Sequence, residues 1–204
     1  MDRRCRTRVK ICGITNKEDA NMVSILGADA IGFVFAESKR KITPEKAREI
    51  IKELPPFITS VGIFVDETLK EVNKMAEFIT LDAVQLHGSE SEEYCSKVNR
   101  KVIKSIKVTK NDTRKSLINK MQNYSVSAFI IDPGKGSGKK FNWEIARKIN
   151  KPIIIAGGLN PENVGQVIRE LNPYGVDVST GVEKDFGIKD KEKVEKFIRE
   201  AHSC

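Results

Sequence analysis

Two side chains capable of proton transfer stand at or near the ends of apolar runs in this chain. Cys12 lies in the run VKICGIT, and Asp132 ends the run SAFIID. A thiol and a carboxyl can act on one substrate as base and acid when the fold brings them together. Gly-rich loops further along the chain can hold a phosphate through backbone N–H groups. Together these residues indicate an enzyme that acts on a phosphorylated small molecule.

Two short loops carry the phosphate-binding prediction. Gly157 and Gly158 follow the apolar run PIIIA, and Ser179, Thr180 and Gly181 follow the run GVDV. Glycine lets the backbone approach a phosphate closely, and the amides of such loops donate to its oxygens. A single Gly-Gly pair is more often an ordinary turn. Two such loops in succession, after the last two strands of a barrel, are typical of a phosphate site.

The elements that must position these side chains alternate along the chain. Short β-branched runs predict eight strands, at 9–14, 30–35, 59–64, 83–86, 102–106, 128–132, 153–156 and 175–178. Amphipathic stretches between them predict helices at 17–26, 44–54, 69–78, 90–98, 143–148, 161–171 and 191–201. Segment 111–123 is polar and poorly periodic, so its helix is the weakest prediction. The pattern predicts a single-domain α/β protein over residues 1–204, a (β/α)₈ TIM barrel.

Local signals support this interpretation over an open, doubly wound sheet. A dinucleotide-binding sheet requires GxGxxG after its first strand, whereas here that strand is followed by CGIT. Thr43-Pro44 and Asn160-Pro161 each pair an N-cap residue with proline, which predicts helix starts at 44 and 161.

Composition limits the classes of partner. The 36 Lys and Arg exceed the 28 Asp and Glu, giving a net charge of +8, which is the only feature that favours a nucleic-acid-binding module. These charges are scattered among glutamates without interleaved aromatic residues, so a solvated surface is the preferred interpretation and no nucleic-acid partner is expected. No apolar run approaches the roughly 18 residues of a membrane helix, so no membrane association is expected either.

The cysteines and the N-terminal residues indicate a cytoplasmic protein. Cys5, Cys12, Cys95 and Cys204 lack CxxC spacing, which predicts reduced thiols and neither a disulfide framework nor a zinc site. The basic stretch MDRRCRTR is not followed by the uninterrupted apolar block of a secretory signal.

An ordered set of motifs resembles one enzyme family over nearly the whole chain. The motifs are KICGIT, GADAIGFVF, SKR, VGIFV, VQLHG, IID with GSGKKFNW, AGGLNPENV and DVSTGVE. They resemble the phosphoribosylanthranilate isomerases of tryptophan biosynthesis. The resemblance implies a TIM barrel that catalyses an Amadori rearrangement of N-(5-phosphoribosyl)anthranilate, in the cytoplasm, without a metal or an organic cofactor. It leaves open whether the chain is a monomer or a homodimer.

The resemblance also implies roles for the acid and the base. Asp132 is expected to protonate the ring oxygen of the ribose, and Cys12 to remove the proton from the second carbon of the sugar. A free thiol has a pKa near 8.5 and an aspartate near 4, so each group would need to be shifted to work near neutrality. Cationic neighbours or a helix N-terminus are expected to lower the pKa of Cys12. Taken alone, Cys12 is more often a buried apolar residue, and Asp132 before a proline often caps a turn.

Three further residues are implied in substrate binding. Arg40, in the SKR motif, is expected to hold the anthranilate carboxylate, for which a guanidinium suits bidentate pairing, although Lys39 and Lys41 adjoin it. His87 and Asp177 end the fourth and eighth predicted strands and are expected to line the pocket.

The loop after Asp132 is rich in glycine and lysine. Gly134, Gly136 and Gly138, with Lys135 and Lys139, are expected to form a flexible loop that closes over the substrate. The run does not match the GxxxxGK[ST] pattern of a nucleotide site.

Two related enzymes are the alternatives to this family. Indole-glycerol-phosphate synthase would require a lysine-rich catalytic set on early strands. The histidine-pathway sugar isomerase would require an aspartate in place of Cys12.

Overall fold

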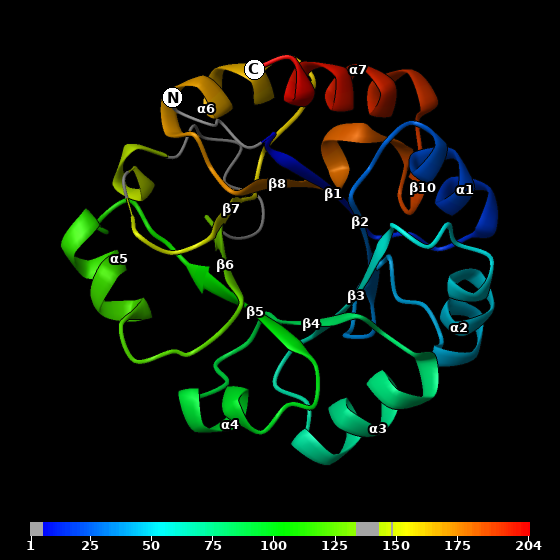
Figure 1. Ribbon diagram of the computed structural model, residues 1–204, viewed down its shortest axis with the longest axis horizontal. Coiled ribbons are helices and arrows are strands. Elements are labelled where there is room, and N and C mark those ends of the chain that lie inside the picture. Colours follow the sequence, from blue (N-terminus) through cyan, green and yellow to red (C-terminus); the bar gives the residue numbers. More distant parts are fainter. Residues whose placement is uncertain (1–5, 134–142, 148) are drawn as a thin grey trace.

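Eight parallel strands close into a ring in the computed structural model, which describes residues 6–133, 143–147 and 149–204 (Figure 1). Residues 10–12 of the first strand pair with the second, and residues 8–11 pair with the eighth, so the ring is continuous. The predicted barrel is therefore confirmed. The strands are β1 (Arg8–Cys12), β2 (Ala30–Val34), β3 (Thr59–Phe64), β4 (Ala83–Leu86), β5 (Lys101–Lys107), β6 (Ala128–Asp132), β7 (Ile153–Ile155) and β8 (Gly175–Val178).

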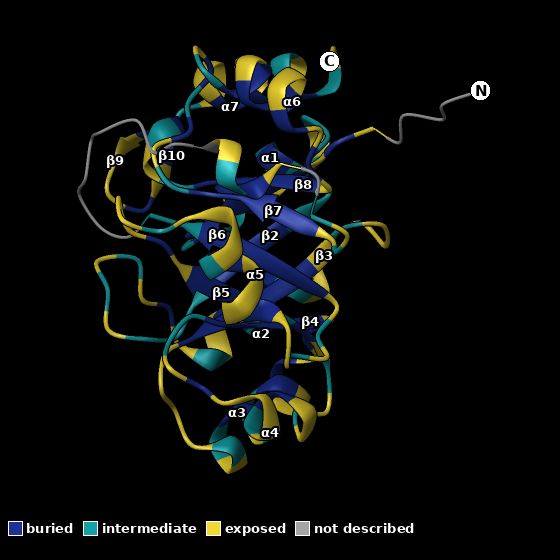
Figure 2. Cartoon of the chain, turned by 90° about the vertical axis from the view of Figure 1, so that its left-hand side faces the viewer, coloured by how far each residue is buried: buried dark blue, intermediate teal, exposed yellow. Residues whose placement is uncertain are grey.

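Helices surround the ring, and their outer sides are exposed (Figure 2). The 3₁₀ helix η1 follows β6 where a helix over 143–148 was predicted; Lys148 lies outside the described residues. The α-helices are α1 (Lys17–Ile25), α2 (Pro44–Lys52), α3 (Leu69–Ile79), α4 (Glu92–Ser96), α5 (Arg114–Met121), α6 (Val164–Leu171) and α7 (Lys191–His202), and η1 is Trp143–Ala146.

Side chains alternate along each strand between the outer side, which packs against the helices, and the inner side of the barrel. In β1, Val9 and Ile11 are fully buried in the main core between strands and helices. Burying one such side chain stabilises the folded state by about 1.5–3 kcal/mol. Lys10 and Cys12 have the opposite parity, because successive side chains point to opposite faces. They therefore share the inner side of the barrel.

Part of the barrel interior is filled by a small apolar cluster of its own. Ala128 and Ile130 of β6 pack with Ile154 and with Ala156, the residue after β7, and Ile103 of β5 completes the cluster. These residues close the interior on one side. The polar side chains of β1, β4 and β8 that point inward come from strands outside this apolar cluster.

Of the two predicted proline-marked helix starts, one is correct and one is wrong. Thr43 caps α2 by accepting a hydrogen bond from the Lys46 backbone, and Pro44 is its first residue. Helix α6, by contrast, begins at Val164 and not at residue 161. The side chain of Asn160 accepts hydrogen bonds from the backbone N–H groups of Glu162 and Asn163. This local turn takes the place of the first helical turn.

Helix α5 confirms the weakest helix prediction, and α4 is shorter than predicted. Thr113 and Ser116 form a reciprocal capping box that begins α5 despite its poor periodicity. The predicted helix at 90–98 contracts to five residues. Glu90 instead pairs with Lys104 at 2.9 Å, and both side chains are at least 97% buried. A buried ion pair therefore replaces the predicted first helical turn.

The segment after β8 holds elements that the sequence did not predict. A 3₁₀ turn, η2 (Thr180–Val182), is followed by a two-stranded antiparallel sheet of β9 (Glu183–Asp185) and β10 (Ile188–Lys189). The sheet is joined by Gly187, whose φ of +74° suits glycine. This hairpin lies between η2 and α7 and contributes to the site described next.

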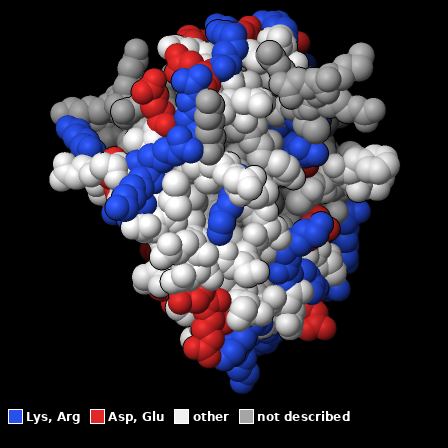
Figure 3. Space-filling view, turned by 60° about the vertical axis from the view of Figure 1, so that its left-hand side comes forward, with Lys and Arg blue, Asp and Glu red and all other residues white. Residues whose placement is uncertain are grey.

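Two surface properties follow from the described residues. None of their helices has both the length and the apolar character needed to cross a membrane. On the face shown in Figure 3, Lys and Arg are interspersed with Asp and Glu and do not gather into one basic surface. On that face, the scattered charge predicted from the sequence is confirmed.

Candidate active site

The predicted proton-transfer residues lie at one end of the barrel. Cys12 ends β1 and Asp132 ends β6, and because all eight strands are parallel these ends open on the same face. Asp177 lies on β8 beside β1, and His87 follows β4 directly. The structure therefore brings these four residues to the carboxyl-terminal mouth, where barrel enzymes hold their catalytic groups.

Cys12 is half-buried, in a charged environment that differs from the one predicted. Burial raises the pKa of the Cys12 thiol, and the nearby cations Lys10 and Lys189 only partly oppose it. Asp177 adds to the rise. The predicted lowering of this pKa is therefore not found in the free protein, because desolvation outweighs the cations.

His87 joins the β4 end to Asp132. Its Nε2 atom lies 3.5 Å from Asp132 Oδ2, and its Nδ1 atom lies 3.2 Å from the amide nitrogen of Gln85. Burial lowers the pKa of His87, although the charge of Asp132 opposes the change, so the ring is neutral at pH 7. With the Gln85 amide donating to Nδ1, the tautomer that fits is the one with its proton on Nε2, the nitrogen that faces Asp132.

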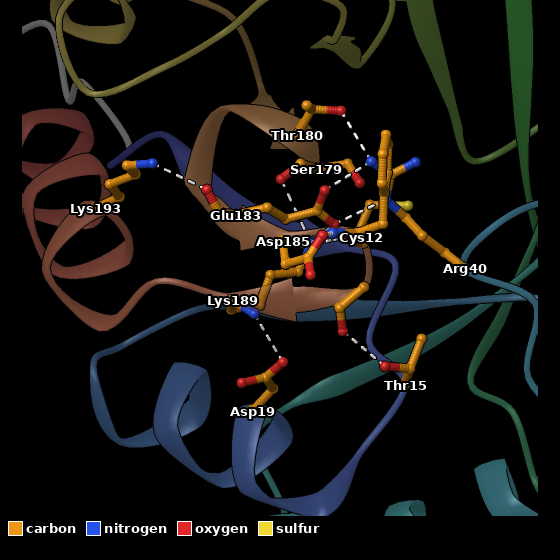
Figure 4. A network of polar contacts seen from close by, with 12 residues as sticks. Cys12, Thr15, Asp19, Arg40, Ser179, Thr180, Glu183, Asp185, Lys189 and Lys193 are labelled. Carbon is orange, nitrogen blue, oxygen red and sulfur yellow. Dashed lines mark hydrogen bonds and ion pairs between the residues drawn. The ribbon is translucent and has the colours of Figure 1, made fainter.

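Arg40 is held beside the last strand by a carboxylate of this chain (Figure 4). Its Nε and Nη2 atoms donate to the two oxygens of Glu183 at 2.7 and 2.6 Å, and Nη2 also donates to the Thr180 hydroxyl at 3.0 Å. The bidentate pairing predicted for a substrate carboxylate is thus formed with Glu183. The Nη1 atom takes no part in these three hydrogen bonds, so it can donate to a ligand.

The neighbouring basic residues of the SKR loop point elsewhere. The Lys41 ammonium pairs with Glu37 at 3.0 Å on the surface. The Lys39 ammonium lies 4.0 Å from the centre of the Phe186 ring. Among the three, Arg40 is therefore the residue joined to the predicted phosphate loop.

Lys189 and Glu183 connect the hairpin to the end of β1. The buried Lys189 ammonium donates to Glu183 Oε1 at 2.9 Å and to the backbone oxygen of Cys12 at 2.7 Å. The Lys189 backbone N–H also donates to Asp19 of α1 at 2.8 Å, as Figure 4 shows. The unpredicted hairpin therefore fixes both Arg40 and the backbone that carries the thiol.

Replacing Glu183 with glutamine is expected to lower the free energy of unfolding by about 3 kcal/mol near neutral pH, the usual cost of removing one partner from a buried ion pair. Burial raises the pKa of Glu183, but Arg40 and Lys189 outweigh burial and hold it below its usual range. Its stabilisation is therefore complete above the unfolded pKa of about 4.3 and is lost as the pH falls through the folded pKa. Urea titrations at about pH 7 and about pH 3.5 should show the deficit shrinking in acid.

Glu162→Gln is the matched control. Its carboxylate is 66% exposed and pairs with Lys196 at 3.1 Å on the surface. Solvent screens such a pair, so no measurable change is expected at either pH. A Glu183→Gln deficit that is equal at both pH values would contradict the proposed charge contribution.

The two predicted phosphate loops lie side by side. Gly157 and Gly158 have φ values of +80° and +70°, a conformation that favours glycine and turns the backbone at the end of β7. A Cβ at Gly181 would overlap the carbonyl oxygen of Leu159, so the loop after β8 packs directly on the loop after β7. Ser179 and Thr180 lie on this second loop. The second loop lies beside Arg40, which donates to the Thr180 hydroxyl.

Several residues of this site were not identified from the sequence. Lys10 and Gln85 each lie two residues before a predicted site residue, so strand alternation could have identified them as inward-facing polar groups. Glu183 and Lys189 lie in short strands with no detectable period. The glycine and lysine loop at 134–139 lies outside the described residues. Within the described ranges, no three His, Cys, Asp or Glu side chains cluster as a metal site.

Comparison with sequence families gives a match along most of the chain. A family model described as N-(5'phosphoribosyl)anthranilate (PRA) isomerase matches residues 9–200. The N-(5'-phosphoribosyl)anthranilate isomerase of Geotalea uraniireducens is 51% identical over 203 residues, covering 96% of this chain and 98% of that protein. The enzyme of the same name from Moorella thermoacetica is 46% identical over 196 residues, covering 94% and 87%.

Solved structures show the same similarity in three dimensions. The crystal structure of phosphoribosyl anthranilate isomerase from Thermotoga maritima is 41% identical, with a TM-score of 0.89, covering 97% of this chain and 100% of that one. A second crystal structure is of a phosphoribosyl anthranilate isomerase in complex with reduced 1-(o-carboxyphenylamino)-1-deoxyribulose 5-phosphate. It is 40% identical, with a TM-score of 0.87 and the same coverage.

Proposed function

The chain belongs to the N-(5'-phosphoribosyl)anthranilate isomerase family, and on this premise we propose which of its side chains carry out the reaction. The enzyme converts N-(5-phosphoribosyl)anthranilate to 1-(2-carboxyphenylamino)-1-deoxyribulose 5-phosphate in L-tryptophan biosynthesis, an aldose-to-ketose Amadori rearrangement. One observation supports the assignment of roles: Cys12 and Asp132 end two different strands at the same mouth of the barrel.

Asp132 is the general acid in this proposal. Its carboxyl donates a proton to the ring oxygen of the ribose, the bond between that oxygen and the first carbon breaks, and the nitrogen lone pair forms a protonated Schiff base. The neutral His87 ring, with its proton on Nε2, lies on the side of Oδ2. His87 therefore orients the Asp132 carboxyl and does not compete for its proton.

Cys12 is the general base. Its thiolate removes the proton from the second carbon of the sugar, and the electron pair of that C–H bond moves into the Schiff base to give an enolamine. The enolamine then tautomerises to the ketose. Because β1 and β6 are separated around the ring by β7 and β8, the two groups approach the sugar from different sides. A sugar bound between them can therefore be opened by one and deprotonated by the other.

The phosphate and the anthranilate carboxylate orient the sugar between these groups. The loops of Gly157–Gly158 and Ser179–Gly181 supply backbone donors for the phosphate, as glycine-rich loops at the end of a barrel's last strands commonly do. The Nη1 edge of Arg40 supplies a charged donor for the carboxylate. Asp177, already paired with Lys10, lines the wall beside Cys12.

Replacing Arg40 with alanine is expected to raise KM by about 10- to 100-fold, which corresponds to the loss of one charged hydrogen bond of about 1.5–3 kcal/mol. We expect kcat to change much less, because Arg40 contacts the substrate away from the reacting carbons. Steady-state kinetics with freshly prepared substrate would measure both constants.

Lys41→Ala is the matched control, since Lys41 adjoins Arg40 but pairs with the exposed Glu37 on the surface. Its KM should stay within about 2-fold of the wild-type value. An equal rise of KM in both variants would show that the effect comes from the overall charge of the loop. It would contradict the proposal that Arg40 binds the substrate.

The proposal extends to partners and location. A relative from Thermotoga maritima is described as dimeric and has also been solved as engineered monomers, so sedimentation of the purified protein would decide between monomer and homodimer. We propose that the enzyme works in the cytoplasm on a small phosphoribosyl substrate. It is not expected to bind DNA or RNA, because its charges are mixed.

A further inference from the structure

Lys10 places a charged group inside the barrel that the roles above do not use. It lies on β1 two residues before Cys12, and the residue is only 4% exposed. An isolated ammonium is costly to bury, so such a group is retained only with charged or hydrogen-bonded partners. The identity of those partners indicates what Lys10 does.

Lys10 pairs with an anion and lies next to the reactive sulphur. Its ammonium pairs with Asp177 Oδ1 at 2.8 Å, where both side chains are at least 90% buried. Its Nζ atom and the Cys12 sulphur border the same small space beside Gly32. Burial lowers the pKa of Lys10, but Asp177 and Cys12 outweigh burial and raise it, so the ammonium stays charged. Asp177 and Lys10 thus form a buried ion pair whose ammonium lies next to Cys12.

The neighbouring strand makes room for this contact. Gly32 of β2 faces the same space, and a Cβ built on it would lie 3.1 Å from both Lys10 Nζ and Cys12 Sγ. The same Cβ would lie 3.0 Å from Ile63 Cδ1. Contacts this short are rarely tolerated, so a side chain at residue 32 would push these groups away. Glycine at this position leaves the space in which the Lys10 ammonium and the Cys12 sulphur lie next to each other.

The other charges that face Cys12 are engaged elsewhere. Lys189 and Arg40 both hold Glu183, and Lys189 reaches the backbone oxygen of Cys12. Asp177 is the anion that faces the thiol, and it raises the thiol pKa. Among the described cations, Lys10 is the one whose ammonium borders the same space as the Cys12 sulphur, and it opposes the rise of the thiol pKa more than Lys189 does.

We propose that Lys10 is a positioning residue whose ammonium serves as the counter-cation of the Cys12 thiolate during removal of the sugar proton. The thiolate accepts the proton from the second carbon and becomes a thiol, while Lys10 keeps its own protons throughout. Lys10 thereby opposes the desolvation that favours the neutral thiol. The inference rests on the proposed role of Cys12 as the base.

The test measures the ionisation of Cys12 directly, without turnover. Alkylation by iodoacetamide as a function of pH would be followed by mass spectrometry in a background carrying Cys5→Ser and Cys204→Ser. Cys95 is buried, and burial raises its pKa to about 11, so its labelling stays slow. In Lys10→Met we expect the midpoint of Cys12 alkylation to rise by about one pH unit or more, which corresponds to a roughly 10-fold loss of thiolate near neutrality.

Two further substitutions separate the charge from the fold. Lys10→Arg should keep the midpoint near that of the parent, since the cation is retained. Asp177→Asn should lower it, because removing the carboxylate removes a charge that raises the thiol pKa. An unchanged midpoint in Lys10→Arg and a lower midpoint in Asp177→Asn keep the proposal testable even if Lys10→Met does not fold.

Lys104→Met is the control for burial alone. Lys104 on β5 is another buried lysine in an ion pair, with Glu90, but it packs on the outer side of the barrel away from Cys12. This variant should lose stability and leave the Cys12 midpoint unchanged. A Lys10→Met midpoint equal to that of the parent would overturn the inference. A Cys12→Ser enzyme with full turnover would instead overturn the proposed base.

Discussion

Replacing Cys12 with serine is expected to lower kcat by about 10³-fold, within the range attributed to a lost general base. Serine is nearly the same size and keeps the position at the end of β1, but its hydroxyl ionises at far higher pH than a thiol. The phosphate loops and Arg40 are unchanged, so binding of the reduced product analogue that a relative binds should stay within about 3-fold. Titration calorimetry and initial-rate measurements would test the two parts.

An isotope effect would identify the step that Cys12 serves. The substrate would be prepared from anthranilate and ribose 5-phosphate carrying deuterium at the second carbon. In Cys12→Ser, cleavage of that C–H bond limits the rate, so the residual turnover should show a full primary isotope effect. Cys204→Ser, an exposed thiol at the far end of the chain, is the control and should behave as wild type. Residual turnover without an isotope effect would contradict the base assignment.

Replacing Asp132 with asparagine is expected to lower kcat by about 10²- to 10⁴-fold, again the range for a lost proton-transfer group. The amide has nearly the same shape and can still lie beside His87 Nε2, but it has no acidic proton to give to the ring oxygen. Circular dichroism and affinity for the reduced product analogue should therefore remain near the wild-type values.

The same deuterated substrate gives the opposite outcome for this variant. Without the acid, opening of the ribose ring limits the rate, and the later C–H cleavage disappears from the measured rate. The isotope effect in Asp132→Asn should therefore fall close to unity. Asp185→Asn is the control, because that carboxylate is exposed and bonds only its neighbouring backbone N–H among the contacts of the described residues. A full isotope effect in Asp132→Asn would contradict the assignment of Asp132 as the general acid that acts before Cys12 removes the proton.

The barrel and its strand limits were largely predictable because the signals are local. The four strands β3, β4, β6 and β8 begin and end where their apolar runs do. A parallel strand buried on both faces is mostly apolar, so its composition largely marks its limits. Helix starts were less predictable. Thr43 and Asn160 carry the same N-cap signal before proline, but the Asn160 side chain bonds two backbone N–H groups in a turn that delays α6.

The chemical environment of the site was predictable only in part. Strand ends identify Cys12 and Asp132, since the carboxyl ends of parallel strands share one face. The pKa of Cys12 was not predictable, because it depends first on burial in the folded chain and also on Asp177 and Lys189, more than 160 residues away in sequence. The pairing of Arg40 with Glu183 is equally distant, across 143 residues. Such contacts leave no period or spacing in a single sequence.

The contact between Lys10 and Asp177 also bears on how the enzyme comes into being on the ribosome. The two residues are 167 positions apart, and β1 pairs with β8 only after nearly the whole chain has been synthesised. Until then the Lys10 ammonium has no counter-ion and must keep its water, so β1 cannot settle into a dry interior. The nascent barrel is therefore expected to remain open along one seam. Emergence of the last strand would close that seam and bring the thiol into its working environment in a single step.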